Sequence, residues 1–371
     1  MWASAKRLRR SAPHDTLVDM VLLLRTARFW RRAQQLCPLL LVLTCVACKR
    51  SDADGVKLSV TGSGPEQLEL RYQGFTGQVL YPELAEDLGL LAPIKLNYVG
   101  NTISGPQDIQ SVVTGDTDYG GAFNGAVIKL IAAKAPIKAV VGYYGTDENT
   151  WAGYYVPEDS PIKAPRDLIG KKIALNTLGA HYEFVLREYL ARGGLSKAEV
   201  DQVTLVVVPP VSGEQALRQK QVDVATLSSI IRDKALSRGG LRLLFSDYQL
   251  FGKFTAGSYV FSEEFLRTKP RTVKKFVEAT SQAIEWARSH PREEVIARFT
   301  AIIGKRHRQE DASAVAYWRS TGIAFPGGVI QESELSVWLD WLVKSGQLPA
   351  GKLQIRDLYT NQFNPFANGP T

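Results

Sequence analysis

The chain has 371 residues, of which 45% are hydrophobic and 22% charged, and its formal net charge is +8. This length is sufficient for two lobes. The excess positive charge lies near the amino terminus, because residues 1–47 hold eight Lys or Arg and two Asp or Glu, and the remainder carries a net charge of +2. Nucleic-acid binding therefore loses its main electrostatic support, and we expect none.

Residues 1–47 have the pattern of a secretion signal. Four arginines precede a 12-residue apolar run at 36–47, which is too short to span a bilayer. The small residues before Cys48 resemble a bacterial lipobox, although Cys45 stands where leucine is usual. We predict that 1–47 is a lipoprotein signal peptide and that Cys48 is lipidated. An ordinary cleaved signal or an uncleaved anchor is the alternative, and Met20 is an alternative start.

The cysteines all lie in or next to this segment, at Cys37, Cys45 and Cys48. The body that follows therefore has no thiol for a disulfide, a zinc site or a nucleophile. Residues 48–65 are polar and contain Gly and Ser, as expected for a tether between a lipid and a domain.

From residue 66 onward, strand and helix patterns alternate. Buried apolar runs predict strands at 68–72, 94–99, 137–144, 173–175, 203–208, 222–227 and 241–245. Apolar spacing and glycine stops predict helices around 80–88, 106–114, 124–133, 182–190 and 229–238, and Ser212 with Gln215 predicts a capping box at another. The chain then becomes helical, at 273–287, 315–319 and 332–343. This alternation indicates an α/β fold with parallel sheets and a ligand crevice at the carboxyl ends of the strands.

The most informative connection joins the strand at 173–175 to the helix that follows it. A helix start presents unpaired N–H groups and the positive end of the dipole. The small residues before the helix let an anion approach, and Thr177 adds a hydroxyl donor. The sequence thus predicts a seat for a carboxylate, sulfonate, nitrate or phosphate group; a plain strand-to-helix connection is the alternative.

Two other glycine-containing stretches, 73–77 and 119–125, also stand between a strand and a helix. Three such loops favour one cleft, although a packing role for 119–125 is an alternative. The sequence has no P-loop, no nucleophile elbow and no metal-ligating spacing of His or Cys. We therefore predict no catalytic residue, metal or cofactor, and recognition is favoured over catalysis.

Four motifs, in this order, resemble the solute-binding proteins of ABC transporters for nitrate, sulfonate and taurine: Tyr81–Leu90, Val113–Gly121, Ser160–Ala174 and Gly257–Ser262. The resemblance extends over about residues 68–300. It implies a two-lobed α/β clamp of the type II periplasmic-binding-protein class, with parallel-type sheets flanked by helices and crossover strands at 154–156 and 257–261. Lobe 1 would comprise 66–154 and a helical second part at 258–371, and lobe 2 would comprise 155–257.

The resemblance also implies a set of ligand-binding residues in the cleft. By position these are Gln73, Gly74, Phe75, Phe123, Asn124, Trp151, Asn176, Thr177, Gly179, Ala180 and His181. Backbone N–H groups of 177–180 would hold the polar head, and the aromatic side chains would enclose an organic body. His181 would add a donor or be a surface residue capping the helix, and Trp151 would line the cleft or pack between the lobes. No arginine lies in these loops, so a neutral or weakly charged ligand is an alternative.

The implied protein is a lipid-anchored solute-binding protein on the periplasmic or extracytoplasmic face of the membrane. It would capture a small organic anion such as an alkanesulfonate, taurine or nitrate, with an ABC permease and ATPase as partners and as a monomer. A binding protein for a pyrimidine or aromatic precursor, or a receptor that senses without transport, are the alternatives. Enzymes of this family that make the thiamine pyrimidine use a cysteine-rich segment, which the body lacks, so we predict no enzyme.

Overall fold

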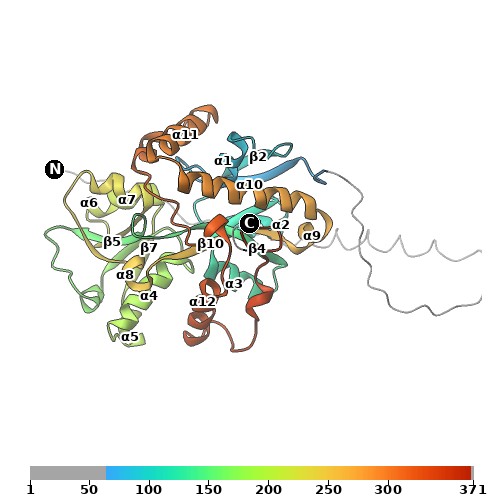
Figure 1. Ribbon diagram of the computed structural model, residues 1–371. Coiled ribbons are helices and arrows are strands. Elements are labelled where there is room, and N and C mark those ends of the chain that lie inside the picture. The colour runs from blue at the N-terminus through green and yellow to red at the C-terminus, as the bar shows by residue number, and fades with distance from the viewer. Residues whose placement is uncertain (1–63, 369–371) are drawn as a thin grey trace, which may run out of the picture. The chain divides into compact units, whose positions relative to one another are not determined.

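The computed structural model describes residues 64–368 (Figure 1). The predicted signal peptide, the lipidation site Cys48 and nearly all of the tether lie outside the described residues.

The first group of strands forms two small sheets. In one sheet, β1 (Glu69–Gly74) is parallel to β2 (Lys95–Asn101). In the other, β10 (Phe254–Ser262) lies between β3 (Tyr119–Phe123) and β4 (Ile137–Thr146) and is antiparallel to both. The helices of this part are α1 (Tyr81–Asp87), α2 (Gly105–Thr114), α3 (Asn124–Ala132), α9 (Glu263–Thr268), α10 (Pro270–Ser289), α11 (Arg292–Lys305) and α12 (Glu332–Lys344), with 3₁₀ turns η3 (Ala312–Tyr317), η4 (Pro326–Gly328) and η5 (Ile355–Asp357). We call residues 64–146 and 254–368 region I.

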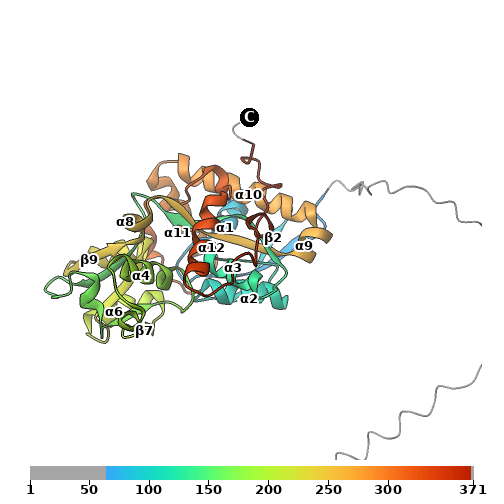
Figure 2. The same ribbon diagram turned by 90° about the horizontal axis from the view of Figure 1, so that it is seen from below.

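The second group of strands forms one five-stranded sheet. Its order is β7 (Thr204–Val207), β6 (Lys172–Leu175), β8 (Val224–Ser228), β5 (Ala152–Pro157) and β9 (Leu241–Ser246). β6 is parallel to β7 and β8, whereas β5 is antiparallel to β8 and β9. The accompanying helices are α4 (His181–Arg192), α5 (Lys197–Val200), α6 (Gly213–Arg218), α7 (Ser229–Leu236) and α8 (Asp247–Phe251), with turns η1 (Pro165–Leu168) and η2 (Pro210–Ser212). We call residues 152–251 region II; Figures 1 and 2 show its elements grouped beside those of region I.

The chain passes between the two groups of strands twice, at 147–151 and at 252–253. The strands at 154–156 and 257–261, where the crossovers are predicted, each lie inside a single sheet, within β5 and β10. These two strands are also antiparallel to their neighbours. The sheet of β3, β10 and β4 is therefore antiparallel and the five-stranded sheet is mixed, whereas β1 and β2 form a parallel pair. Strand–helix alternation does not predict the direction of these two strands, because the chain enters each of them directly from the other region.

The long helix predicted at 273–287 is confirmed as α10, and its apolar face builds the core of region I. Val273, Phe276 and Ile284 are fully buried there. They belong to one hydrophobic cluster with residues of β1 and α1, including Leu70 and Leu84. This core fixes the position of the β1–α1 connection, which contributes to the site described next.

Three local predictions are wrong. The helix predicted at 315–319 is replaced by the 3₁₀ turn η3, which ends at Tyr317. The stretch 119–125 is not a loop, because 119–123 forms the fully buried strand β3. Its glycines permit close packing: a Cβ on Gly121 would lie 2.8 Å from the ring of Tyr143, and one on Gly120 would lie 2.7 Å from the Asp108 carbonyl oxygen. The capping box at Ser212 is absent, because this residue has helical backbone angles and its side chain accepts no capping hydrogen bond.

Candidate functional site

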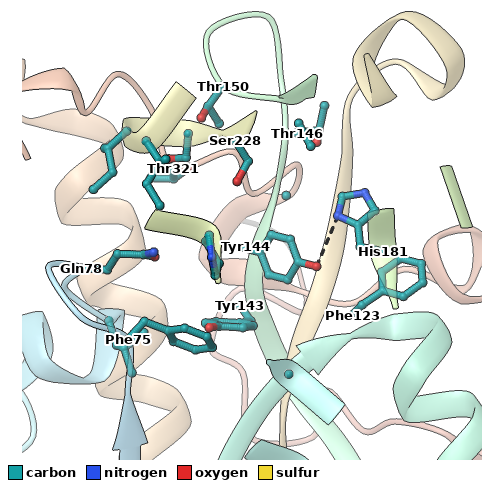
Figure 3. Close-up of a pocket in the computed structure, with 18 of the residues that line it drawn as sticks. Phe75, Gln78, Phe123, Tyr143, Tyr144, Thr146, Thr150, His181, Ser228 and Thr321 are labelled. Carbon is teal, nitrogen blue, oxygen red and sulfur yellow. Dashed lines mark hydrogen bonds between the residues drawn. The ribbon is translucent and has the colours of Figure 1, made fainter. Parts of the chain in front are cut away.

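A cavity of about 230 Å³ lies between regions I and II (Figure 3). Its walls include the residues that follow strands β1, β6 and β8 and the first residues of helices α1, α4 and α7. The β1–α1 connection contributes Phe75 and 78–81, the β6–α4 connection contributes Asn176 and 180–182, and the β8–α7 junction contributes 228–231. Residues at the starts of α1, α4 and α7 therefore border one space, and the positive end of a helix dipole lies at each start. Some N–H groups there are used within the chain, since that of Leu80 donates to Glu83 and that of Ser229 to the Trp151 carbonyl.

Aromatic rings form one wall of this cavity. The ring centroid of Tyr143 lies 6.5 Å from that of Phe75, 5.1 Å from that of Tyr144 and 4.7 Å from that of Tyr259. Burial raises the pKa of all three tyrosines well above the ordinary value, so their hydroxyls stay protonated at neutral pH. The wall thus combines apolar ring faces with neutral hydroxyl groups.

Further polar side chains line the cavity. The neutral ones include Thr146, Thr150, Ser228, Ser320 and Thr321, and Asp247 adds a carboxylate. The hydroxyl groups of Ser228 and Tyr182 are hydrogen-bonded at 2.7 Å. Within residues 64–368, no lysine or arginine belongs to the lining. A bound polar group would therefore meet hydroxyls and helix dipoles, not a permanent positive side chain.

Trp151 lines the cavity from the segment that connects the two regions. The guanidinium of the buried Arg232 lies 3.8 Å from its ring centroid, and Nη1 of Arg232 donates to the Trp151 carbonyl at 3.2 Å. Arg232 is in turn paired with Asp233 at 2.8 Å. Trp151 therefore both borders the cavity and packs on region II, which combines the two predicted alternatives.

His181 is the first residue of α4 and lines the cavity. Its Nδ1 lies 3.4 Å from the Tyr144 hydroxyl, as Figure 3 shows, and its Nε2 lies 3.3 Å from Oδ2 of Asp247. The ring stacks on Phe123 with centroids 5.0 Å apart. The histidine is 5% exposed, so the alternative of a surface residue capping the helix is wrong.

The Asp247 carboxylate joins three segments near the passage between regions. Its Oδ2 accepts a hydrogen bond from the Thr146 hydroxyl at 2.8 Å, at the end of β4. Its Oδ1 accepts from the backbone N–H of Ala152 at 3.0 Å and of Tyr248 at 2.7 Å. The side chain is fully buried, and these donors compensate the loss of water around it.

Six of the predicted ligand-binding residues line the cavity: Phe75, Phe123, Trp151, Asn176, Ala180 and His181. Five are not among the lining residues: Gln73, Gly74, Asn124, Thr177 and Gly179.

Contacts within the chain explain several of these absences. Asn124 donates to the Thr255 carbonyl at 3.2 Å and accepts from Ser258 at 2.8 Å, so its amide is used inside the protein. The Gly179 N–H donates to Glu183 at 2.7 Å. This N–H belongs to the predicted anion seat, but a carboxylate of the same helix occupies it.

Some of the missed lining residues had a sequence signal. Ser228 ends the buried strand β8 and directly precedes a helix, which is the same pattern that led to Asn176. Asp247 likewise follows strand β9 and begins α8. Tyr144 had no such signal, because it belongs to the predicted strand 137–144 itself. Its contact with the predicted His181 joins residues far apart in the chain, which meet only because region II folds against β4.

Within residues 64–368, no cluster of three or more His, Asp or Glu side chains is placed to hold a metal ion. No helix among the described ones combines the length and apolar character needed to cross a membrane.

Residues 94–294, more than half of the chain, match the protein family described as NMT1/THI5 like. In sequence, a protein of Escherichia coli (strain K12) that carries the provisional name of an aliphatic sulfonates-binding protein is 26% identical over 255 residues. This alignment covers 65% of the present chain and 73% of the relative.

Solved structures with low sequence identity share the fold. The alkanesulfonate-binding protein SsuA from Xanthomonas axonopodis pv. citri, bound to MOPS, has a TM-score of 0.63 at 21% identity, covering 81% of this chain and 100% of that one. The periplasmic nitrate-binding protein NrtA from Synechocystis PCC 6803 has a TM-score of 0.63 at 14% identity, covering 81% and 88%. The desulfurization enzyme DSZB has a TM-score of 0.54 at 18% identity, covering 80% and 97%. The predicted α/β fold of the periplasmic binding proteins is confirmed.

Proposed function

Because this chain belongs to the NMT1/THI5-like family, we propose that it is the solute-binding protein of an ABC importer. The proposed solute is a small organic anion such as an alkanesulfonate, taurine or nitrate. The observation that carries the proposal is the cavity of about 230 Å³ between regions I and II, where three helix starts and several hydroxyls adjoin an aromatic wall. The names of the sulfonate-binding relatives support the same solute class.

The chemistry of the lining refines the solute. An aromatic wall is best covered by an apolar or flat organic part, and hydroxyls with helix dipoles suit a single negative charge. An organic sulfonate has both parts, whereas nitrate would leave the wall uncovered. Since no lysine or arginine lines the cavity within residues 64–368, a multiply charged anion is disfavoured.

Entry of a solute requires the two regions to separate. We propose that regions I and II act as two lobes. The sequence predicts them at 66–154 with 258–371 and at 155–257, and we place the boundaries instead at the short connections 147–151 and 252–253, which would bend as hinges. A closed, occupied clamp would then be the form offered to an ABC permease and its ATPase.

We further propose that the protein acts as a lipid-anchored monomer outside the cytoplasm, with Cys48 as the lipidated residue. Cys48→Ser should move the protein from the membrane fraction to the soluble fraction and remove the lipid mass from the N-terminal peptide. Unchanged fractionation without a lipid on that peptide would contradict this anchor. Size-exclusion chromatography checks the monomer.

The solute class can be tested by thermal shift followed by calorimetry. The panel contains nitrate, taurine, methanesulfonate, benzenesulfonate, benzoate and a pyrimidine, because a ligand that binds the folded state raises the melting temperature. Gln78→Leu removes an amide from the lining, and we expect roughly tenfold weaker binding of the best anion. The exposed Gln110→Leu on α2 is the matched control and should bind like the wild type. No shift with any anion would overturn the proposed solute class.

The alternatives make different predictions in the same experiments. A pyrimidine-precursor protein would respond to the pyrimidine and not to the sulfonates, as the aromatic wall would allow. An enzyme would release a changed molecule, so mass spectrometry of the recovered solute separates catalysis from binding. A sensing receptor would bind the same solutes but would not support their uptake in cells.

A further inference from the structure

We infer that the anionic group of the solute binds at the start of α7, where a small second cavity adjoins the main one. At this place, which we call the α7 seat, the hydroxyls of Thr226 and Ser228 and the N–H groups of Ile230 and Ile231 donate hydrogen bonds to the oxygens of the anion. The inference rests on the proposed function, because it needs an anionic solute. It assigns the anion to other residues than the seat that the sequence predicts at 177–180.

The small cavity has a volume of about 10 Å³ and lies at the carboxyl ends of β6 and β8. It shares five lining residues with the main cavity: Asn176, Tyr182, Pro210, Ser228 and Ile231. A space of this size admits about one oxygen-sized atom. One oxygen of a solute in the main cavity can therefore enter the small cavity where the two linings meet.

Thr226 provides the small cavity with a hydrogen-bonding group that has no partner. This residue is 7% exposed and lines the small cavity, and its hydroxyl forms no hydrogen bond within residues 64–368. Thr226 and Ser228 are two residues apart in β8, so their side chains leave the same face of the strand. A buried hydroxyl without a partner is unfavourable, and a solute oxygen in the small cavity would satisfy it.

The start of α7 adds backbone donors. Ile230 and Ile231 line the main cavity, and their N–H groups, in the first turn of the helix, form no hydrogen bond within the part of the chain that the structure describes. The first turn of α7 contains no acidic residue. The first turns of α1 and α4 contain Glu83 and Glu183, whose carboxylates accept hydrogen bonds from N–H groups at those helix starts. Among these three helix starts, an anion at α7 therefore meets no competing carboxylate in the first turn.

Tyr182 orients the Ser228 hydroxyl. The two hydroxyl oxygens are 2.7 Å apart, and either group can be the donor. Burial raises the pKa of Tyr182 to about 12, so this residue keeps its proton at neutral pH. When Tyr182 donates to Ser228, the Ser228 O–H is free to donate to the solute, and Figure 3 shows this hydroxyl directed into the main cavity. The seat thus offers neutral donors, which suit a single negative charge.

The position of the seat determines how a solute lies in the main cavity. The helix α7 belongs to region II, whereas Phe75 and Tyr143 of the aromatic wall belong to region I. A solute with its anionic group at the seat and its organic part on the wall therefore contacts both regions. Such a solute stabilises the closed arrangement of the two regions.

The test is calorimetric titration of Thr226→Val with benzenesulfonate. Valine resembles threonine in shape but has no hydroxyl, so we expect about tenfold weaker binding. The free energy of unfolding should stay equal or rise, because the hydroxyl that is removed has no partner within residues 64–368. Thr280→Val is the matched control, since Thr280 of α10 is also buried with an unpartnered hydroxyl in this range but does not line the cavity. It should show the same change in stability and an unchanged affinity.

Two further variants distinguish the anionic group of the solute from its organic part. Ser228→Ala removes the second hydroxyl, and it should weaken the binding of benzenesulfonate and of methanesulfonate by the same factor because the two solutes share the anionic group. Tyr143→Ala, at the aromatic wall, should weaken benzenesulfonate more than methanesulfonate, which has no ring.

The outcomes separate the two proposals. If Thr226→Val and Ser228→Ala bind benzenesulfonate with the affinity of the Thr280→Val control, the α7 seat is overturned and the solute-binding function stands. A Thr226→Val protein much less stable than the control would show that the hydroxyl is already paired without a solute, which also overturns the seat. If the wild type binds none of benzenesulfonate, methanesulfonate, taurine and nitrate, both the anion-binding function and the seat are overturned.

Discussion

Two of the contacts between regions I and II have opposite chemistry. The first, which we call the aromatic contact, inserts Phe184 of α4 among rings of region I. Its ring centroid lies 5.1 Å from that of Phe123, 6.2 Å from that of Trp338 and 4.2 Å from that of Trp341. Phe184, Phe123 and Trp338 are almost completely buried, so this contact belongs to the hydrophobic core.

The second, which we call the polar contact, joins α7 to η3 and the residues around it. Lys234 Nζ lies 3.0 Å from Asp311 Oδ2 and 2.6 Å from Ser313 Oγ. Ser237 bonds the Tyr317 hydroxyl at 3.0 Å, and the mostly exposed Arg319 pairs with Asp233 of α7 at 2.9 Å. Asp311, Ser313, Ser237 and Arg319 are exposed to water and salt, whereas Asp233 is buried.

The difference indicates which contact can open. Separating the aromatic contact would expose large buried rings, which is costly. An exposed ion pair contributes about 0–1 kcal/mol and is screened by salt, so the ion pairs of the polar contact cost little to separate. Ile230 of α7 is also buried in the core cluster of region I, and opening would expose this aliphatic side chain, a smaller area than the rings of the aromatic contact. We therefore expect the aromatic contact to act as the pivot and the polar contact to open when a solute enters.

Among the substitutions that test this difference, we expect Phe184→Ala to change the stability most. Truncation of a buried phenylalanine typically costs about 3–5 kcal/mol of stability, and here it would also loosen the pivot. Urea denaturation should show this loss. Leu178→Ala is the control, because Leu178 is 54% exposed and should change the free energy of unfolding by less than about 0.5 kcal/mol. Equal effects of the two substitutions would show that the aromatic contact is not part of the core.

A pH series distinguishes the two contacts, because the pKa values of carboxylates near them are shifted in opposite directions. Asp108 accepts from the Gly121 N–H of β3, the strand that carries Phe123, at 2.7 Å, and burial raises its pKa to about 7. In the polar contact, hydrogen bonds from Ser313 and Lys234 hold the pKa of Asp311 below its ordinary range.

The direction of each pKa shift determines whether the stability rises or falls with pH. The contribution of protonated Asp108 to stability is complete below its ordinary pKa of about 4 and is lost as the pH rises through about 7. Relative to Asp108→Asn, the wild type should therefore lose on the order of 2–3 kcal/mol between pH 5 and pH 8. Asp311 acts in the opposite direction, since its contribution is lost only as the pH falls below its ordinary pKa. Parallel pH profiles of the wild type and Asp108→Asn in urea denaturation would contradict this account.

The smallest expected effect is that of Lys234→Met. It removes two bonds of the polar contact, and we expect less than about 1 kcal/mol of lost stability and a solute affinity reduced only severalfold. High salt should reduce the wild-type affinity in the same way and affect the variant less. Lys274→Met, which breaks a pair with Glu278 inside α10, is the control. A loss as large as that of Phe184→Ala would show that the polar contact is not an easily opened one.

Local patterns predicted most of the fold. Helices such as α2 and strands such as β4 have apolar spacing or runs that the chain displays directly, and Gly115 ends α2 in the left-handed conformation that favours glycine. The strand β3 is not predicted by such patterns. Its residues are buried on both faces and two of them are glycines, so neither alternation nor apolar character marks it.

The candidate site was only partly predictable, for a similar reason. Phe75, Asn176 and His181 follow strands or begin helices, and this local position places them at the cavity. The contact of His181 with Tyr144 and Asp247 spans 37 and 66 residues of sequence and depends on how region II packs against β4. No local pattern encodes such a contact. The Gly179 N–H is not available to an anion, because the Glu183 side chain, four residues on, accepts its hydrogen bond.

We propose that a bound solute closes the polar contact, while the aromatic contact stays in place as the pivot. Because all native cysteines precede residue 49, spin labels can be placed in a chain with those three changed to serine. Cysteines at the exposed positions Gln215 and Ala316 would report on the polar contact, and cysteines at Ala191 and Asp340 on the aromatic contact. Benzenesulfonate should shorten and narrow the first distance distribution and leave the second unchanged. A change in the second pair, or no change in the first under saturating solute, would contradict the account.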